Sequence, residues 1–175
     1  MYTEQDFKAA IREINDFPKE GILFYDITTL LKSPEAFGQL IKGMADKLRE
    51  LDVDVVVGPE ARGFVVGAPV AYELGAGLVL ARKPGKLPAK VESISYGLEY
   101  GSDSLEIHSD AIKPGMRVAV VDDLLATGGT ALAVAKLIES MGANVVGMCF
   151  AVELTQLNGG ELLKQFNVSS MILHW

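Results

Sequence analysis

The sequence has few cysteines and no long apolar run, and both shortages limit what the protein can be. Its one cysteine, Cys149, excludes a disulfide framework within the chain. Cys149 lies in the apolar run from Val145 to Val152, where a small buried side chain is expected rather than a nucleophile. No apolar stretch is long enough to cross a membrane, and the polar, acidic N-terminus does not have the pattern of a signal peptide. We therefore expect a cytoplasmic protein without a membrane partner.

Basic residues are also scarce. The 16 lysines and arginines are outnumbered by 23 aspartates and glutamates, which gives a formal net charge of -7. A general nucleic-acid-binding protein carries a basic face, so no nucleic-acid partner is expected, and any anionic ligand must be held by local basic groups. A chain of 175 residues, 49% of them apolar, can bury a good core, so residues 1–175 are expected to form a single domain.

Two common nucleotide-binding motifs are missing. No lysine follows the glycines as in a P-loop, and the dinucleotide fingerprint G-x-G-x-x-G is absent. The most informative stretch that is present runs Val118-Ala-Val-Val-Asp-Asp-Leu-Leu-Ala-Thr-Gly-Gly-Thr130. Its first four residues, 118–121, predict a buried strand of a parallel sheet. Leu137, Ile138 and Met141 follow at helical spacing, so the order is strand, glycine-rich loop and helix start.

This order of elements suits a ribose phosphate. The start of a helix presents unpaired backbone N–H groups and the positive end of the helix dipole, and glycines let the backbone approach an anion closely. Thr127 and Thr130 add hydroxyl donors, so the loop can hold a phosphate monoester. Asp122 and Asp123, at the carboxyl end of the strand, can accept hydrogen bonds from a ribose diol. The alternative is an ordinary strand end, in which the aspartates and glycines form a turn.

The rest of the chain alternates between strand and helix patterns. Helices are expected at 4–14, 34–50 (with Ser33 as N-cap), 64–74 (with a kink or an irregular first half at Pro69) and 159–165; strands are expected at 53–57, 78–81, 118–121, 145–152 and 171–173. This alternation predicts an α/β fold with a parallel twisted sheet flanked by helices. In such sheets ligands bind outside the carboxyl ends of the strands. Three strand ends carry polar groups there: 60–63, 82–83 and 122–130.

The segment from Pro84 to about Ser104 does not fit this alternation. Glycines, prolines, lysines and two tyrosines interrupt it, so we expect a poor core element that serves as a functional lid or is disordered. The alternating residues Leu105 to His108 predict that the chain then returns as a strand.

The central stretch, with its apolar run, two acids and T-G-G-T, resembles the motif of the type I phosphoribosyltransferases that binds 5-phosphoribosyl 1-pyrophosphate (PRPP). The resemblance covers almost the whole chain and is greatest to the members that use adenine. It is carried by further stretches of the sequence: Asp16-Phe-Pro18 with Gly21 and Phe24-Tyr-Asp-Ile27; Gly58-Pro-Glu-Ala-Arg-Gly-Phe64; Arg82-Lys83 with Gly85-Lys-Leu-Pro88; Tyr96-Gly-Leu-Glu-Tyr-Gly101; and Val152-Glu-Leu154.

The resemblance implies a pentosyltransferase of purine salvage that converts adenine and PRPP to AMP and pyrophosphate with magnesium. It also implies a core sheet, a small hood built mainly from residues 1–32, a flexible loop at about 83–104, and a homodimer. Magnesium is expected to be held mainly through PRPP and water, with few or no direct protein ligands.

The resemblance also assigns roles to particular residues. The 5′-phosphate loop falls on Ala126, Thr127, Gly128, Gly129 and Thr130, and the ribose-binding acids on Asp122 and Asp123. The pyrophosphate groups fall on Arg62, Arg82, Lys83 and Lys86, and the adenine-contacting segment on Leu23, Phe24 and Tyr25. Glu99 and Arg62 are expected to be catalytic, with Tyr100 beside Glu99 in the loop.

Several of these residues have an ordinary structural alternative. Phe24 could stack on a purine or belong to the core, and Glu99 could be a solvated loop carboxylate. Tyr25 stands where many relatives carry a basic residue. Two other functions also remain open: a phosphoribosyltransferase for 6-oxopurines, and a PRPP-sensing regulator that keeps the fold without catalysis.

Overall fold

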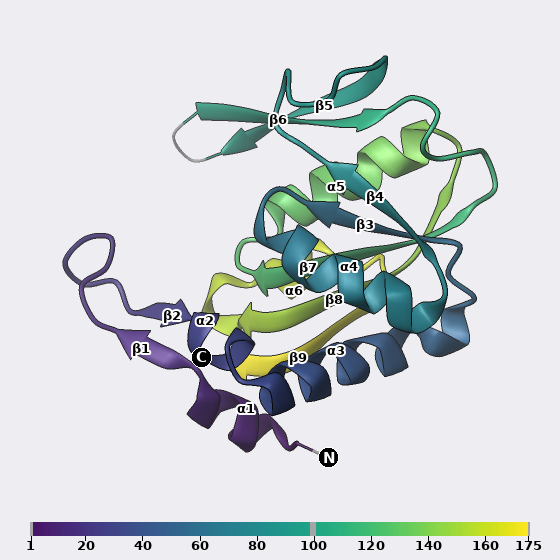
Figure 1. The fold of residues 1–175 in the computed structure, drawn as a ribbon. Helices are drawn as coiled ribbons and strands as arrows, with labels where there is room; N and C mark the ends of the chain where they lie inside the picture. The colour runs from purple at the N-terminus through teal and green to yellow at the C-terminus, as the bar shows by residue number, and fades with distance from the viewer. Residues whose placement is uncertain (1, 99–100, 175) are drawn as a thin grey trace.

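The computed structural model, which describes residues 2–98 and 101–174, has a five-stranded parallel sheet at its centre (Figure 1). The strand order is β4-β3-β7-β8-β9. The strands are β3 (Val55–Pro59), β4 (Gly77–Ala81), β7 (Arg117–Leu125), β8 (Asn144–Leu154) and β9 (Val168–His174). The predicted fold class is thereby confirmed, and each of the five predicted strands is present with slightly different bounds.

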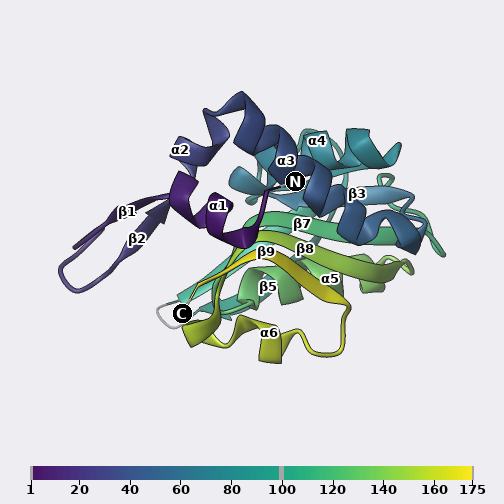
Figure 2. The ribbon, with the colours of Figure 1, turned by 90° about the horizontal axis from the view of Figure 1, so that it is seen from below.

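Helices cover both faces of this sheet. Helices α3 (Pro34–Leu48) and α4 (Arg62–Leu74) lie on one face and α5 (Gly129–Ser140) on the other, as Figure 2 shows. The alternation along β7 explains this arrangement, because Ala119 and Val121 belong to the cluster with α3 and α4, whereas Val118 and Val120 belong to the cluster with α5. The strand is therefore apolar on both faces, as a central parallel strand must be.

The two long helices of the first face start as local sequence rules require. Ser33 caps α3, its Oγ accepting a hydrogen bond from Ala36 N at 3.3 Å, and Pro34 occupies the first turn. Helix α3 ends at Leu48 and a short 3₁₀ turn, η1 (Arg49–Leu51), follows it. Helix α4 is α-helical throughout with Pro69 inside it, so of the two alternatives predicted at Pro69, a kink or an irregular first half, the irregular first half is wrong.

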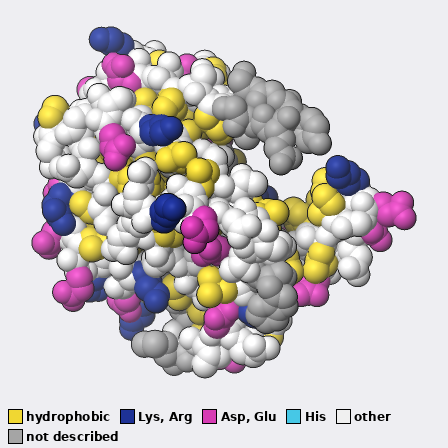
Figure 3. Space-filling model, turned by 180° about the vertical axis from the view of Figure 1, so that it is seen from behind, with side chains coloured by type: hydrophobic (Ala, Val, Ile, Leu, Met, Phe, Trp, Pro, Cys, Tyr) yellow, Lys and Arg dark blue, Asp and Glu magenta, His cyan; other side chains and the backbone are white. Residues whose placement is uncertain are grey.

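The N-terminal segment forms a small hood, part of which projects from the body of the molecule (Figure 3). It contains α1 (Glu4–Ala10), β1 (Arg12–Ile14), β2 (Phe24–Asp26) and α2 (Thr28–Leu31). The predicted helix at 4–14 is wrong over its last residues, because β1 pairs antiparallel with β2 instead of continuing α1. An ion pair of 2.5 Å between Arg12 Nη2 and Asp26 Oδ2 supports this pairing, which no local pattern indicates.

The segment expected to be a lid or a disordered loop contains a β-hairpin, so the alternative of a disordered loop is wrong for its described strands. Strands β5 (Val91–Leu98) and β6 (Gly101–His108) pair antiparallel, and the predicted strand at 105–108 is the end of β6. Leu105 and Ile107 are fully buried, and Ile94 and Tyr96 pack against the same core cluster. The alternation Ser93-Ile-Ser-Tyr96 is the strand signal that the surrounding glycines and prolines obscured. Glu99 and Tyr100 lie outside the described residues.

The remaining elements are short or confirm the predicted pattern. Strand β8 leads into η2 (Thr155–Leu157) and α6 (Gly159–Leu162), which is shorter than the predicted helix at 159–165. Cys149 is fully buried in β8, and burial raises the pKa of its thiol to about 11, so the expectation of an inert core residue is confirmed. Among the described residues, no helix has the length and apolar character needed to span a membrane.

Candidate functional site

The site lies where the direction of chain winding reverses. From β3 the chain passes through α4, on one face, to the edge strand β4; from β7 it passes through α5, on the other face, to β8. β3 and β7 are neighbours, so their carboxyl ends flank the crevice in which open α/β sheets bind ligands. A cavity of about 350 Å³ occupies this crevice. Its lining comes almost entirely from the two strand ends: Glu60, Ala61, Arg62, every residue from Asp122 to Ala131, and Phe150.

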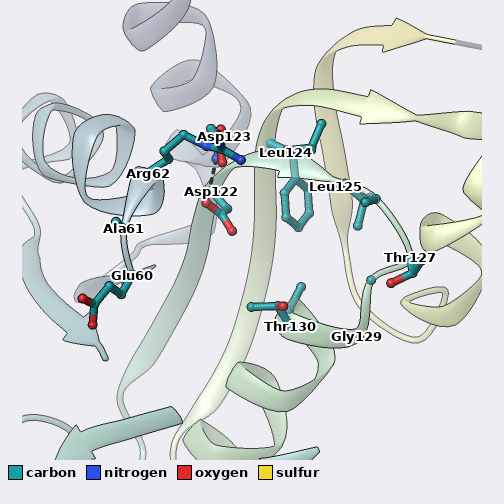
Figure 4. Close-up of a pocket in the computed structure, with 14 residues that line it drawn as sticks. Glu60, Ala61, Arg62, Asp122, Asp123, Leu124, Leu125, Thr127, Gly129 and Thr130 are labelled. Carbon is teal, nitrogen blue, oxygen red and sulfur yellow. Dashed lines mark hydrogen bonds and ion pairs between the residues drawn. The ribbon is translucent and has the colours of Figure 1, made fainter. Parts of the chain in front are cut away.

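The glycine-rich loop forms one wall of this cavity. Gly128 is the N-cap of α5 with φ +84°, a left-handed conformation that favours glycine, and no side chain caps the helix. The first N–H groups of α5 therefore have no intrahelical partner and can face an anion. All five residues assigned to a 5′-phosphate line the cavity, and Figure 4 shows Thr127 and Thr130 on the side opposite Glu60 and Ala61.

The two aspartates lie between the loop and Arg62, inside the last part of β7 rather than after it. The Asp123 side chain is 8% exposed, and its Oδ2 lies 2.5 Å from Arg62 Nε, as the dashed line in Figure 4 marks. Asp122 Oδ1 accepts a hydrogen bond from the Asp123 backbone N–H at 2.9 Å. Burial raises the pKa of the Asp122 carboxyl well above its usual value, and the adjacent Asp123 carboxylate raises it further. The two carboxyl groups thus have different electrostatic environments although they are neighbours in sequence.

The four residues assigned to pyrophosphate do not all reach this cavity. Arg62 lines it, whereas Arg82 and Lys83 lie at the end of β4 and Lys86 is exposed beyond them. Arg82 connects the two strand ends, since its Nε and Nη2 each lie 3.1 Å from a different carboxylate oxygen of Glu60. This charge-assisted pairing lowers the pKa of Glu60. The sequence places Glu60 at the strand end but does not indicate its partner.

A polar contact between the hairpin and the phosphate loop was also not predicted. Tyr96 Oη lies 3.4 Å from Thr130 Oγ1 and donates to Asp103 Oδ2 at 3.4 Å. Asp103 also forms an ion pair with Lys83 Nζ, and this hydrogen bond lowers the pKa of Asp103. Two groups assigned to PRPP, the Lys83 ammonium and the Thr130 hydroxyl, are therefore joined through the hairpin. Residues this far apart in sequence carry no local signal of such contact.

The hood residues adjoin the same site. Two further cavities, of about 360 Å³ and 130 Å³, are both lined by Phe24 and Tyr25, and both share Arg62 and Asp123 with the main cavity; Leu23 lines the smaller of the two. The ring of Phe24 packs edge-on against Phe17, with centroids 5.0 Å apart.

Phe24 is not part of either core cluster, so the core alternative for Phe24 is wrong. Tyr25 packs against the core of the first face, and burial raises its pKa. The aromatic partner Phe17 belongs to the motif 16–18, but no local pattern predicts its contact with Phe24 across the hood hairpin.

No group of three or more potential metal-ligating side chains occurs within residues 2–98 and 101–174. The acidic pair Asp122 and Asp123 is nevertheless beside the phosphate loop. One or two carboxylates fit a magnesium ion that takes its other ligands from substrate phosphates and water.

Comparison with known proteins agrees with this geometry. The model of the phosphoribosyl transferase domain matches residues 27–173. The adenine phosphoribosyltransferase of Alkaliphilus metalliredigens is 63% identical over 162 residues, which cover 93% of this chain and 95% of that protein. The crystal structure of the adenine phosphoribosyltransferase of Thermoanaerobacter pseudethanolicus superposes with a TM-score of 0.94 at 53% identity, covering 98% of this chain and 99% of that one.

A third similar structure contains ligands. The adenine phosphoribosyltransferase of Saccharomyces cerevisiae, complexed with an imino-altritol 1,6-bisphosphate and adenine, superposes with a TM-score of 0.90 at 39% identity and covers 97% of this chain and 98% of its own. The fold and the site thus define a phosphoribosyltransferase. By its relatives, the chain belongs to the adenine phosphoribosyltransferase family, enzymes of purine salvage.

Proposed function

We propose that the protein transfers the phosphoribosyl group of PRPP to adenine with magnesium, giving AMP and pyrophosphate. The observation that carries this proposal is the cavity between β3 and β7, where a phosphate-binding loop, two aspartates and Arg62 meet. The complex of the S. cerevisiae enzyme with adenine and a sugar-like bisphosphate supports it from a relative.

In this proposal the 5′-phosphate lies on the N–H groups of the loop 126–130 and on the hydroxyls of Thr127 and Thr130. Asp122 and Asp123 accept hydrogen bonds from the ribose hydroxyls. The adenine ring occupies the space between the sheet and the hood, against the Phe24 ring, and backbone groups of residues 23–25 contact its edge. Each role agrees with the residues that line the three cavities, which share Arg62 and Asp123.

The leaving pyrophosphate is held by basic groups that are engaged with acids in the free protein. On binding, Arg62 must exchange its ion pair with Asp123 for one with a pyrophosphate oxygen. Lys83 must likewise exchange its ion pair with Asp103 for one with pyrophosphate. Arg82 and Lys86 contribute from the end of β4, with Arg82 oriented by Glu60. A planar guanidinium suits the paired oxygens of pyrophosphate.

The reaction needs positioning more than covalent chemistry. Positive charge develops on the ribose C1 as pyrophosphate leaves, so the residues must align base and sugar and keep water out. A bound magnesium ion would neutralise charge on the pyrophosphate oxygens. Asp122 and Asp123 would lie beside it, and most of its ligands would be PRPP oxygens and water.

The hairpin is proposed to close over the reacting atoms. Glu99, with Tyr100 beside it, would share a proton with a ring nitrogen of the purine during transfer. Both residues lie outside the described part of the chain, and this role rests on the sequence motif 96–101.

The proposed assembly is a homodimer through the face formed by α4 and the edge strand β4. Val65 and Tyr72 on α4 are 46% and 85% exposed, and Leu78 on β4 is 40% exposed. An apolar face beside an open sheet edge is normally covered in solution. Sedimentation velocity of the wild type and of Tyr72→Glu checks this part: a dimer that Tyr72→Glu weakens supports the face, whereas a monomeric wild type contradicts it. The proposed location is the cytoplasm.

The experiment that tests the function measures AMP and pyrophosphate formed from adenine and PRPP, with and without magnesium. Equal amounts of both products are expected, only when magnesium is present. Thr130→Val should bind both PRPP and AMP more weakly, because both carry the 5′-phosphate. Asp122→Asn and Asp123→Asn should weaken PRPP binding without unfolding the protein. Absence of AMP, or unchanged affinity in all three variants, would reject the proposal.

A further inference from the structure

The phosphate loop packs directly on a glycine from the far end of the chain. Gly159, the first residue of α6, is buried, and its position is such that a Cβ atom there would lie 2.2 Å from the carbonyl oxygen of Ala126. The same Cβ would lie 3.0 Å from Leu125 Cδ1. From the other side, a Cβ on Gly128 would lie 2.9 Å from the carbonyl oxygen of Gly159. The two backbones are thus in contact without an intervening side chain.

The segment that carries Gly159 is itself fixed to the core. Leu163, directly after α6, is fully buried in the cluster that also contains Leu125 and Phe150. Asn158, with φ +54°, forms the corner between η2 and α6, and its carbonyl accepts a hydrogen bond from Glu161 N at 3.1 Å. Because this segment follows β8, the neighbour of β7, it reaches the loop at the end of β7 directly.

We propose that Gly159 is a positioning residue for the 5′-phosphate. Its backbone supports Ala126 to Gly128 from outside the cavity and so fixes the direction of the loop N–H groups. The inference rests on the proposed function, in which this loop holds the 5′-phosphate of the substrate. Gly159 does not line the cavity and would not touch the ligand itself.

The physical basis is the short distance. Non-bonded heavy atoms pack at about 3.5–4.0 Å, so a methyl group at position 159 would displace the loop or α6 by on the order of 1 Å. A misplacement of about 1 Å near a reacting site can lower the rate by roughly 10²-fold. The backbone conformation itself allows alanine, since Gly159 is not among the residues with positive φ, and alanine has a higher helix propensity than glycine. The cost of the substitution is therefore steric, and its largest part is the contact with the loop carbonyl of Ala126.

The matched control is the next residue. A Cβ on Gly160 would approach only Glu153 Oε1, at 3.0 Å, and this is the end of a flexible side chain. Gly160→Ala makes the same chemical change one position further along the same helix. Leu162→Ala is a second, milder test. The Leu162 side chain is 46% exposed and lies beside the loop, since a Cβ on Gly128 would be 3.4 Å from Leu162 Cδ2. Both variants are expected to fold.

The experiment measures ribose 5-phosphate binding by titration calorimetry, the KM values for PRPP and adenine, and thermal unfolding. We expect Gly159→Ala to weaken ribose 5-phosphate binding and raise the KM for PRPP by about tenfold or more, with the KM for adenine within about threefold of wild type. Leu162→Ala should weaken ribose 5-phosphate binding by a smaller factor, and Gly160→Ala should leave it unchanged.

Three outcomes would overturn the inference. In the first, Gly159→Ala binds ribose 5-phosphate as tightly as Gly160→Ala does. In the second, it unfolds at a lower temperature with unchanged affinity, which would mean a merely structural role. In the third, it fails to fold and Leu162→Ala binds normally. If the wild type itself does not bind ribose 5-phosphate, the proposed role of the loop is rejected. That result distinguishes failure of the proposed function from failure of the inference about Gly159.

Discussion

Arg62 Nε lies 2.5 Å from Asp123 Oδ2, so the cation proposed to hold pyrophosphate and an acid proposed to hold ribose neutralise each other in the free protein. The Asp123 side chain is 8% exposed and that of Arg62 is 56% exposed. A nearly buried carboxylate is thus stabilised by a guanidinium that can still turn toward solvent or ligand. In the proposed complex, PRPP would replace this pair by two new ones, with its diol on Asp123 and its pyrophosphate on Arg62.

The first prediction concerns this pair. Arg62→Ala leaves the Asp123 carboxylate buried without its cation, so the variant should unfold at a lower temperature than wild type. Asp123→Asn combined with Arg62→Ala should recover much of that loss, because no charge is then left unpaired, while PRPP binding stays weak. Thermal unfolding of the two single variants and the double variant measures the coupling. Strictly additive changes in stability would show that the pair contributes nothing.

The second prediction concerns pH. Because burial raises the pKa of Asp122, the contribution of this group to stability is fully present below its unfolded value of 3.8 and is lost as the pH rises through the folded pKa. Asp122→Asn does not titrate, so it should be more stable than wild type at pH 7, with the difference shrinking toward pH 4. Its PRPP affinity should nevertheless fall.

The control for Asp122 is Asp110→Asn, the same change at an exposed position. Chemical denaturation at several pH values decides between them. A pH-independent difference between wild type and Asp122→Asn, or the same pH-dependent gain in Asp110→Asn, would contradict the assignment of the shift to burial at the site.

The third prediction concerns Lys83. In the free protein its ammonium is paired with Asp103, and a partly exposed ion pair is worth about 0.2–1 kcal/mol. Asp103→Asn removes this competitor, so pyrophosphate should bind up to about fivefold more tightly at low salt. The gain should shrink as ionic strength rises, because salt screens charges near the surface. Calorimetry at two salt concentrations measures both effects; weaker binding in the variant would mean that Asp103 orients Lys83 toward the ligand instead.

The fourth prediction concerns the hairpin tip. Glu99→Gln should lower kcat by about 10²–10⁴-fold with a smaller effect on PRPP affinity if the glutamate is a general acid–base group. Trypsin should cut the free protein at Lys86 or Lys90, because Lys83 precedes Pro84 and is not a cleavage site, and PRPP should slow this cleavage. Near-normal turnover of the variant, without protection of these lysines by PRPP, would remove the catalytic role from this segment.

The sequence predicted the parts of the site that are close together in the chain. Asp122 and Thr130 belong to one continuous unit of strand, loop and helix. The hydrophobic periodicity and the residue composition of this stretch therefore predict where both residues lie. Ser33 and Pro34 likewise start α3 by local rules alone. Arg62 could be added because parallel strands bring their carboxyl ends to one edge.

The contacts that were missed depend on pairing between distant segments. Residues Arg12 to Ile14 continue a helical pattern in sequence, but pairing with β2 overrides that preference. Tyr96 reaches Thr130 only because β5 and β6 form a hairpin over α5, and Gly159 reaches the loop only through the order of the sheet. Register and packing of this kind leave no signal in a window of neighbouring residues.

The central claim is most directly tested by a competition assay with labelled adenine, hypoxanthine and guanine, each at the same concentration with PRPP and magnesium. Adenine carries an amino donor at C6 where the other two bases carry a carbonyl, so the wrong base leaves a buried acceptor unpaired. This mismatch costs about 1–3 kcal/mol, which corresponds to roughly fivefold to 160-fold in kcat/KM. We predict AMP as the dominant product by at least this factor. Equal conversion of hypoxanthine, or PRPP binding without conversion of any base, would contradict the account.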